Sequence, residues 1–242
     1  MSKYPYKLSL IIPAYNEEKK IECDIKEAFS YLSKKKVIGE VIVSTDGITD
    51  KTNEIVKKLQ KKYKNLHLIA HKNKIGKGMA IKKGVEKAQG KYIMFADAGY
   101  CVPFSYINDG IKKLEEGNDC ALASRAFRNS HIKKKQPLYR QIGSKVFGLI
   151  VRNILGVPKH IKDTQCGFKI YKNNIAKDLF SKLRTKAMMF DIEIILRAKK
   201  NKYKMASFAV EWKNDLDTKF NPISGSIVNF KDLYKMKLKY RL

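Results

Sequence analysis

Four short apolar runs alternate with amphipathic stretches in the first half of the chain, and this alternation most limits what the chain can fold into. The apolar runs are residues 8–12, 37–43, 66–70 and 92–95. Between them, apolar residues recur at the three- and four-residue spacing of helices. Strands separated by helices pair in parallel, because the crossover between them has room for a helix. The pattern therefore predicts an α/β fold with a mostly parallel central sheet flanked by helices.

Polar residues gather where these runs end. Tyr15 to Glu17 follow the first run, Asp46 follows the second and Asp97 follows the fourth. Ligands of such sheets bind beyond the carboxyl ends of the strands, so we expect these residues to share one site. Alone, Glu17 suits the first turn of a helix and Asp46 suits an ordinary turn. Their combination at successive strand ends favours a ligand site.

A turn with the sequence Gly76-Lys77-Gly78 precedes the third helical stretch. Together with the carboxylates, it suggests a site for a nucleotide and a metal ion. Carboxylate oxygens can accept hydrogen bonds from a base or ribose, and they are the ligands that Mg²⁺ or Mn²⁺ prefers. For Lys77 itself two interpretations stay open, a contact to the charged part of a nucleotide or a solvated lysine in a turn.

The second half of the chain is less regular. Helices are predicted at 106–116, 139–155 and 187–198, and strands at 120–124, within 163–171 and at 206–212. Four widely spaced cysteines argue against a disulfide framework and a zinc site. Neither a signal peptide nor a transmembrane helix is expected, because no apolar run approaches the roughly 18 residues that a span requires.

The chain carries 51 Lys and Arg against 23 Asp and Glu, a formal net charge of +28. Solvated lysines explain part of this excess. An anionic membrane surface, nucleic acid and a phosphorylated substrate are the specific alternatives. We do not expect nucleic acid as a partner, because the lysines are spread along the chain instead of being gathered with aromatic residues in a known binding motif.

Several motifs resemble those of family 2 glycosyltransferases, which have the GT-A fold. The matching runs are Ile11–Glu17, Thr45–Thr52, Gly76–Gly78 and Phe95–Asp97. Three further runs resemble the polyprenyl-phosphate branch, especially the dolichyl-phosphate β-glucosyltransferases: Ala123–Arg125, Arg140–Ser144 and Asp163–Lys169. The resemblance covers residues from about 8 to 212. It implies inverting transfer of a hexose, glucose being expected, from a UDP-sugar to a polyprenyl (dolichyl) monophosphate.

The resemblance assigns the donor site residue by residue. It implies that uracil and ribose contact the first motif, that Asp46 accepts a hydrogen bond from the base, and that Lys77 lies near the diphosphate. The first motif supplies Pro13, Ala14, Tyr15 and Glu17. Asp97 would be a catalytic residue that holds Mg²⁺ or Mn²⁺. The family pattern is Asp-x-Asp, whereas this chain has Asp97-Ala98-Gly99, so another acid or only water and phosphate oxygens would complete the metal shell.

On the acceptor side, the resemblance implies that Arg125 and Arg140 bind the lipid phosphate, which a guanidinium can grip with two hydrogen bonds. Asp163 is the candidate catalytic base or aligning carboxylate, with a turn cap as the structural alternative. Gln165 and Asp191 are secondary candidates. Because a phosphate monoester has a second pKa of about 6, the acceptor is already anionic near neutrality and needs little base strength.

A single catalytic domain, 1–242, is expected. Its parts are a nucleotide-binding half (8–99), an acceptor-side half (100–212) and a basic amphipathic tail (213–242). Basic amphipathic segments at 139–155 and 229–242 suggest a cytoplasmic enzyme held peripherally on an anionic membrane, although each segment alone could equally pack on the core. A soluble sugar or polysaccharide acceptor is the alternative within the same enzyme class, and a basic nucleic-acid-binding module is the alternative outside it. No oligomeric state is predicted.

Overall fold

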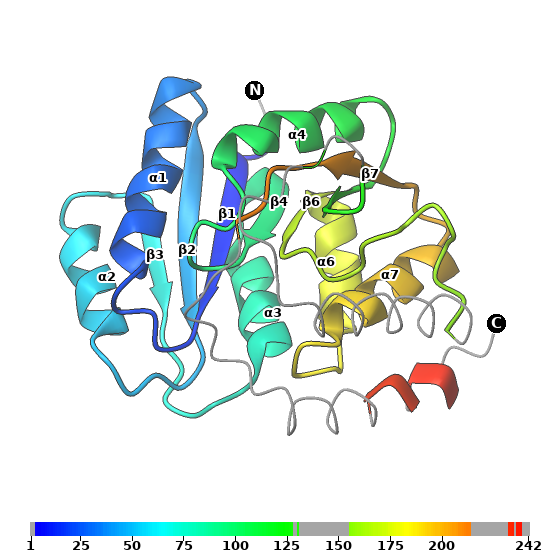
Figure 1. The fold of residues 1–242 in the computed structure, drawn as a ribbon. Helices are drawn as coiled ribbons and strands as arrows, with labels where there is room; N and C mark the ends of the chain where they lie inside the picture. Colours follow the sequence, from blue (N-terminus) through cyan, green and yellow to red (C-terminus); the bar gives the residue numbers. More distant parts are fainter. Residues whose placement is uncertain (1–2, 128–129, 131–154, 214–231, 235, 239–242) are drawn as a thin grey trace.

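The computed structural model describes residues 3–127, 130, 155–213, 232–234 and 236–238. Its strands form one seven-stranded sheet in the order β3-β2-β1-β4-β6-β5-β7, with helices on both faces (Figure 1). The strands are β1 (Tyr6–Ala14), β2 (Gly39–Thr45), β3 (Leu66–Ile69), β4 (Gly90–Ala96), β5 (Cys120–Ser124), β6 (Phe168–Lys172) and β7 (Met205–Ala209).

The pairing of the strands confirms a mostly parallel sheet. β1 pairs in parallel with β2 and β4, β2 with β3, and β5 with β7. β6 is antiparallel to both of its neighbours, β4 and β5. Because β6 runs the opposite way, its first residues lie at the edge where β4 and β5 end. The loop that leads into β6 is thereby brought to the predicted ligand edge.

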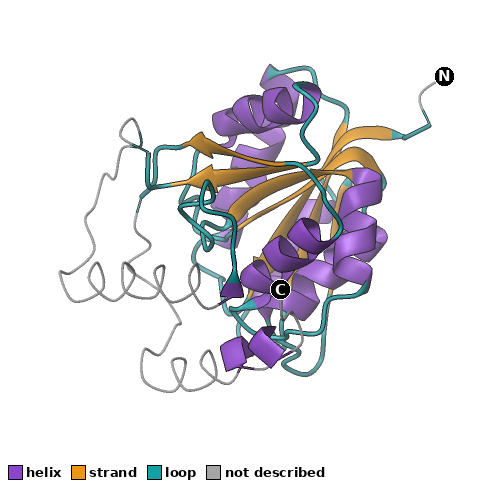
Figure 2. Cartoon of the chain, turned by 90° about the vertical axis from the view of Figure 1, so that its right-hand side faces the viewer, coloured by secondary structure: helices purple, strands orange, loops and turns teal. Residues whose placement is uncertain are grey.

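The helices form one layer on each face of the sheet, as Figure 2 shows. Buried side chains of α1, α2 and α4 share one apolar core with the sheet, and those of α3, α6 and α7 share the other. The helices are α1 (Ile21–Lys34), α2 (Thr52–Gln60), α3 (Lys77–Lys87), η1 (Phe104–Tyr106), α4 (Ile107–Glu115), α6 (Asn173–Ser181) and α7 (Phe190–Lys200).

Both faces of the central strands are buried, which explains why their sequences are mostly apolar. In β1, Leu10 and Ile12 face the α1 layer, whereas Ile11 between them faces the α3 layer. Successive side chains of a strand point to opposite faces, so a strand covered on both faces is mostly apolar, with buried exceptions such as Ser9 and Glu40. The two cores hold the strand ends, and with them the polar residues, in fixed relative positions.

Two details differ from the sequence prediction. The first strand does not stop at Ile12 but continues through Pro13 to Ala14. β1 pairs with β2 up to Ala14 but with β4 only up to Ile11, and a proline is tolerated where one side of a strand is unpaired. The sequence pattern also missed α6, whose opening residues Asn173 and Asn174 are poor helix formers.

Some predicted elements lie outside the described residues. Arg140 lies outside the described residues, and so does the predicted helix at 139–155 except for its last residue. Most of the tail lies outside them as well. Of the tail, 232–234 and 236–238 are helical. Within the described residues, none of the helices combines the length and apolar character needed to cross a membrane.

Candidate active site

The ends of β1 and β2 are joined by Asp46. Its amide donates to the carbonyl oxygen of Ala14, 3.0 Å away. Its buried carboxylate accepts hydrogen bonds from the amides of Ile75 and Gly76, at 2.5 and 2.8 Å. Asp46 therefore fixes the turn that leads into α3. The predicted hydrogen bond from a uracil base to Asp46 stays a prediction.

The first motif is braced by the loop after β2. Asn16 has a left-handed backbone conformation (φ 54°), and its side chain exchanges hydrogen bonds with Thr49. The amide of Glu17 donates to the hydroxyl of Thr52 at 2.9 Å. These contacts hold the residues after β1 in a fixed loop, and Asp46 lies beside its first residues through its bond to Ala14.

Two lysines approach this edge of the sheet. The ammonium group of Lys74 lies 4.1 Å from the centre of the Tyr15 ring, within the range of a cation–π contact. That of Lys77, the first residue of α3, lies 2.6 Å from Oδ1 of Asp97. Burial alone would lower the pKa of Lys77, but the Asp97 carboxylate raises it above its ordinary value. Lys77 is therefore a fixed positive charge beside Asp97, and its contact to a nucleotide stays a prediction.

Asp97 follows β4 directly and remains accessible. Its side chain is 33% exposed. Its amide donates to the carbonyl oxygen of Gly167 at 2.8 Å, and a Cβ atom on Gly167 would lie 2.1 Å from the Asp97 carboxylate. Only glycine fits at position 167 without moving Asp97. A cavity of about 20 Å³, lined in part by Asp97, Gly167 and Trp212, adjoins the carboxylate.

Arg125 and Asp163 form a two-point ion pair on the acceptor side. Nε and Nη2 of Arg125 donate to the two carboxylate oxygens at 2.7 and 2.9 Å, and the Arg125 amide adds a third hydrogen bond. Burial alone would raise the pKa of Asp163, but the Arg125 charge lowers it below its ordinary value. The amide of Gln165 also donates to Asp163. A carboxylate held in this way is a weak base and favours the aligning role.

Trp212, the only tryptophan of the chain, connects the two sides. Its ring lies 5.2 Å from the guanidinium carbon of Arg125, and it lines the cavity beside Asp97. The amide of Lys213 donates to the carbonyl oxygen of Cys101 at 2.8 Å, which holds this segment against the loop after β4. Arg125 and Asp97 therefore both lie close to Trp212.

The sequence analysis missed a second ion pair, between Lys169 on β6 and Asp191 on α7. Both are buried, with side chains 1% and 7% exposed, and Lys169 also donates to the carbonyl oxygen of Thr164. Burial raises the pKa of Asp191 more than the Lys169 charge lowers it. Asp191 therefore faces a lysine in the core. Charged residues placed among the apolar residues of β6 and α7 were the available signal for this pair.

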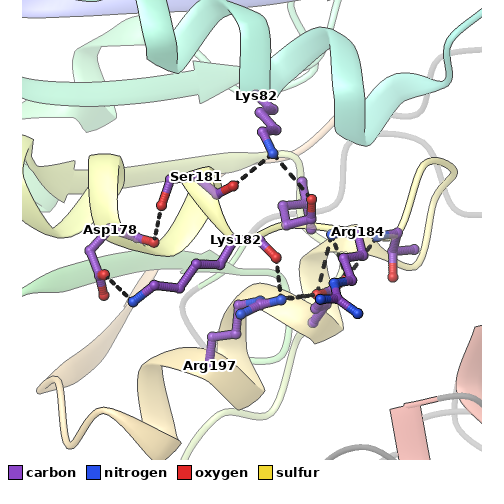
Figure 3. Close-up of polar contacts among 9 residues, drawn as sticks. Lys82, Asp178, Ser181, Lys182, Arg184 and Arg197 are labelled. Carbon is purple, nitrogen blue, oxygen red and sulfur yellow. Dashed lines mark hydrogen bonds and ion pairs between the residues drawn. The ribbon is translucent and has the colours of Figure 1, made fainter.

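Hydrogen bonds also fix the connection between α6 and α7 (Figure 3). Lys82 of α3 donates to the carbonyl oxygen of Ser181 at 2.7 Å, and Arg197 of α7 donates to that of Lys182. Further along, the carbonyl oxygen of Lys186 accepts from the amide of Gly78 at 2.8 Å. This connection therefore supports the start of α3, where Lys77 lies.

A buried acid beneath the turn after Asp97 also escaped the sequence analysis. Asp24 on α1 is 2% exposed and accepts a hydrogen bond from the amide of Gly99 at 2.8 Å. Burial raises the pKa of Asp24 to about 7. The signal in the sequence was a charged residue beside Ile21, Ile25 and Ala28, the apolar positions of the helix.

For a metal ion, the described residues offer a limited set of ligands. They contain no cluster of three or more His, Cys, Asp or Glu side chains suited to a metal. Asp97 is the accessible carboxylate at the described strand ends; the absence of a side chain at Gly167 makes room for that carboxylate, and a small cavity adjoins it. This set fits a cation held by one protein carboxylate together with phosphate oxygens of a ligand, because Mg²⁺ usually keeps most of its shell from water and phosphate.

Comparison with known proteins defines the class first. Residues 9–180 match the model of the family described as Glycosyl transferase family 2, and the chain belongs to this family. It is a glycosyltransferase with the GT-A fold. Its structure is similar to the crystal structure of glucosyl-3-phosphoglycerate synthase from Mycobacterium tuberculosis in complex with Mn²⁺, uridine diphosphate and phosphoglyceric acid. The TM-score is 0.69 at 15% identity, covering 97% of this chain and 78% of that one.

Two curated relatives indicate the branch of the family. The chain is 33% identical to a dolichyl-phosphate beta-glucosyltransferase of Dictyostelium discoideum, over 97% of this chain and 75% of that protein. It is 32% identical to the human protein of the same name, over 96% of this chain and 75% of that protein. The predicted family and branch are confirmed.

Proposed function

We propose that the protein transfers glucose from UDP-glucose to dolichyl phosphate or a similar polyprenyl phosphate, with inversion at the sugar. The observation that carries this proposal is the placement of both Asp97 and Arg125 beside Trp212. Asp97 offers a carboxylate at strand ends, which suits a nucleotide diphosphate with its cation. Arg125 offers a guanidinium, which suits a second phosphate. The names of the curated relatives describe the same reaction class.

The donor binds at the ends of β1, β2 and β4. Residues Pro13 to Glu17 surround the nucleoside, and Asp46 both shapes the turn at 75–76 and accepts from the base. Lys77 contributes positive charge to the diphosphate, since its ammonium is held beside Asp97. The solved synthase similar to this chain contains uridine diphosphate, which agrees with a UDP-sugar as the donor.

Asp97 holds the divalent cation, Mg²⁺ or Mn²⁺, together with the donor phosphates. When bound, such a cation stabilises the negative charge that develops on the departing UDP. Asp97 is restrained for this task by its amide bond to Gly167 and by Lys77. Lys77 would also neutralise part of the developing charge by itself, because a fixed cation in a preorganised site needs no reorganisation during the reaction.

On the acceptor side, Arg125 positions the lipid phosphate, and Arg140 is proposed to assist it. A phosphate oxygen attacks the anomeric carbon from the face opposite UDP, the new carbon–oxygen bond forms, and the bond to UDP breaks. The attacking oxygen is already anionic, so no strong base is required. Asp163 therefore acts by orienting Arg125, with which it shares two hydrogen bonds.

We also propose that the enzyme works at the cytoplasmic surface of an anionic membrane, as a peripheral protein. The net charge of +28 supports attraction to anionic lipids. In the described part of the C-terminal tail, Leu233 and Met236 are buried, whereas Tyr234 and Leu238 are 65% and 54% exposed. Exposed apolar groups among basic residues suit the interface between lipid and water.

A transfer assay tests the proposal. Radiolabelled UDP-glucose, UDP-galactose and GDP-mannose are each incubated with a short polyprenyl phosphate and with Mg²⁺, Mn²⁺ or EDTA. We expect label from UDP-glucose to enter the organic phase with a metal present, and to be lost in Asp97→Asn. Asp119→Asn is the matched control, because Asp119 precedes β5 at the opposite end of the sheet. UDP binding without lipid product from any donor would exclude the lipid acceptor and favour a soluble one.

A further inference from the structure

The buried face of α1 contains an acid that the fold does not need for packing. Asp24 lies among Ile21, Ile25 and Ala28, which are fully buried, and is itself 2% exposed. Burying a carboxylate costs free energy unless hydrogen bonds compensate for the lost water. A leucine or methionine would fill such a position without that cost. The partners of Asp24 therefore indicate what the carboxylate does.

Those partners lie in the turn that begins at Asp97. The carboxylate accepts from the amide of Gly99 at 2.8 Å, and the amide of Tyr100 is close enough to lower its pKa. Gly99 and Tyr100 both have positive φ values, 93° and 48°. Such a conformation is uncommon for tyrosine and persists only where the surroundings enforce it. Two successive amides thus point toward one carboxylate on α1.

A second acid on α1 holds the same turn. Burial, and after it the Glu27 carboxylate, raises the pKa of the Tyr100 hydroxyl, with which Glu27 shares a hydrogen bond. Asp24 and Glu27 are three residues apart and so lie on the same side of the helix. The turn is therefore held through its backbone by one acid and through its side chain by the other.

We propose that Asp24 is a positioning residue for Asp97. By holding the amides of the turn that Asp97 begins, it sets the orientation of the Asp97 carboxylate, and thereby the affinity for a nucleoside diphosphate with its cation. This inference rests on the proposed function for the role of Asp97. Position 99 is a glycine, so the turn has no side chain there that a bound ligand could hold. The turn is held instead by its hydrogen bond to Asp24 on α1.

Glu40 offers a matched control at the other end of the sheet. It is 1% exposed and accepts from the amide of Gln89 at 2.7 Å and from the hydroxyl of Ser9 at 2.6 Å. Asp24 and Glu40 are therefore both buried acids that hold a backbone amide. They differ in that only Asp24 holds the turn that begins at Asp97.

The first experiment measures binding of UDP in the presence of MnCl₂ by titration calorimetry. Asp24→Leu removes the acceptor for the turn amides, and we expect about tenfold weaker binding. Asp24→Asn keeps an acceptor oxygen and is expected to stay within about threefold of the wild type. Glu40→Gln is expected to bind as the wild type does. Wild-type affinity in a folded Asp24→Leu protein would overturn the proposal.

The second experiment follows amide hydrogen exchange of the peptide that contains 97–103, without ligand. We expect faster exchange in Asp24→Leu and near-normal exchange in Asp24→Asn, with no change at this peptide in Glu40→Gln. If Asp24→Leu does not fold, unchanged exchange in Asp24→Ala overturns the inference. Failure of the wild type to bind UDP would overturn the proposed function, whereas the exchange result still tests whether Asp24 holds the turn.

Discussion

The charged pairs on the donor side and on the acceptor side of the site differ in kind. On the donor side, Lys77 and Asp97 make one contact, and their side chains are 22% and 33% exposed. On the acceptor side, Arg125 grips Asp163 with two side-chain hydrogen bonds, and Asp163 is 9% exposed. Behind this pair, Lys169 and Asp191 are almost completely buried.

Because of this difference, the donor-side charges can exchange their contact for one with a ligand, whereas the buried charges cannot. A single contact open to water can be replaced by a phosphate or a cation at little cost, because both groups stay partly hydrated. When one member of a buried pair is removed, the other is left as an uncompensated buried charge, and that costs several kcal/mol. The donor-side pair is therefore suited to bind a ligand directly. The buried acceptor-side charges instead hold Arg125 and β6 in place.

The largest effect is expected when one partner is removed from the most deeply buried pair, Lys169 and Asp191. Lys169→Met leaves Asp191 buried and unpaired, and we expect the free energy of unfolding to fall by about 3–5 kcal/mol. Urea denaturation measures the loss. Lys172→Met on the same strand is the control, because Lys172 is 35% exposed in its pair with Asp119 and should cost less than about 1 kcal/mol. Equal losses in the two variants would contradict the comparison.

For the donor-side pair we expect a large loss of activity and little loss of stability. Asp97→Asn should lower kcat/KM for glucosyl transfer by about 10²–10³-fold, equivalent to about 2.7–4 kcal/mol of transition-state stabilisation. The free energy of unfolding should change by less than about 1 kcal/mol, because both side chains stay partly hydrated. Steady-state kinetics and urea denaturation of the same preparation measure both. An unstable Asp97→Asn protein would mean that this pair, too, is structural.

Substitution of Arg125 should have an intermediate effect. Arg125→Lys keeps the charge but loses the planar fork that grips Asp163, so the group that faces the acceptor is less well oriented. We expect a loss of about 10–100-fold in kcat/KM for the lipid acceptor, or about 1.4–2.7 kcal/mol. The affinity for UDP should stay unchanged, and titration calorimetry provides that control. A matching loss of UDP affinity would show that the two sides are not separable.

The sequence predicts the donor side better than the acceptor side, for a physical reason. Asp46 and Asp97 follow parallel strands, and parallel strands place their ends at one edge whatever the details of packing. The Lys169–Asp191 pair depends on β6 entering the sheet antiparallel between β4 and β5, which no local pattern encodes. Asp24 likewise contacts Gly99 only because of how α1 packs over the loop after β4. Contacts set by tertiary packing were therefore missed.

The smallest expected effect concerns pH and the Arg125–Asp163 pair. Because Arg125 lowers the pKa of Asp163, the pair stabilises the fold above the pKa of an unfolded aspartate, about 3.9, and this stabilisation is lost as the pH falls through the lower folded-state value.

In Arg125→Lys the pKa of Asp163 should be lowered less, so the variant has less stability to lose on acidification. We expect it to be about 1 kcal/mol less stable than the wild type at pH 7, with the gap narrowing as the pH falls below about 4, through the folded-state pKa values of Asp163. Urea denaturation at several pH values measures the gap. A gap of constant size would show that Arg125 stabilises the fold by packing on Trp212 and not through the charge of Asp163, and the acceptor-side pair would then resemble the donor-side pair more closely than its geometry indicates.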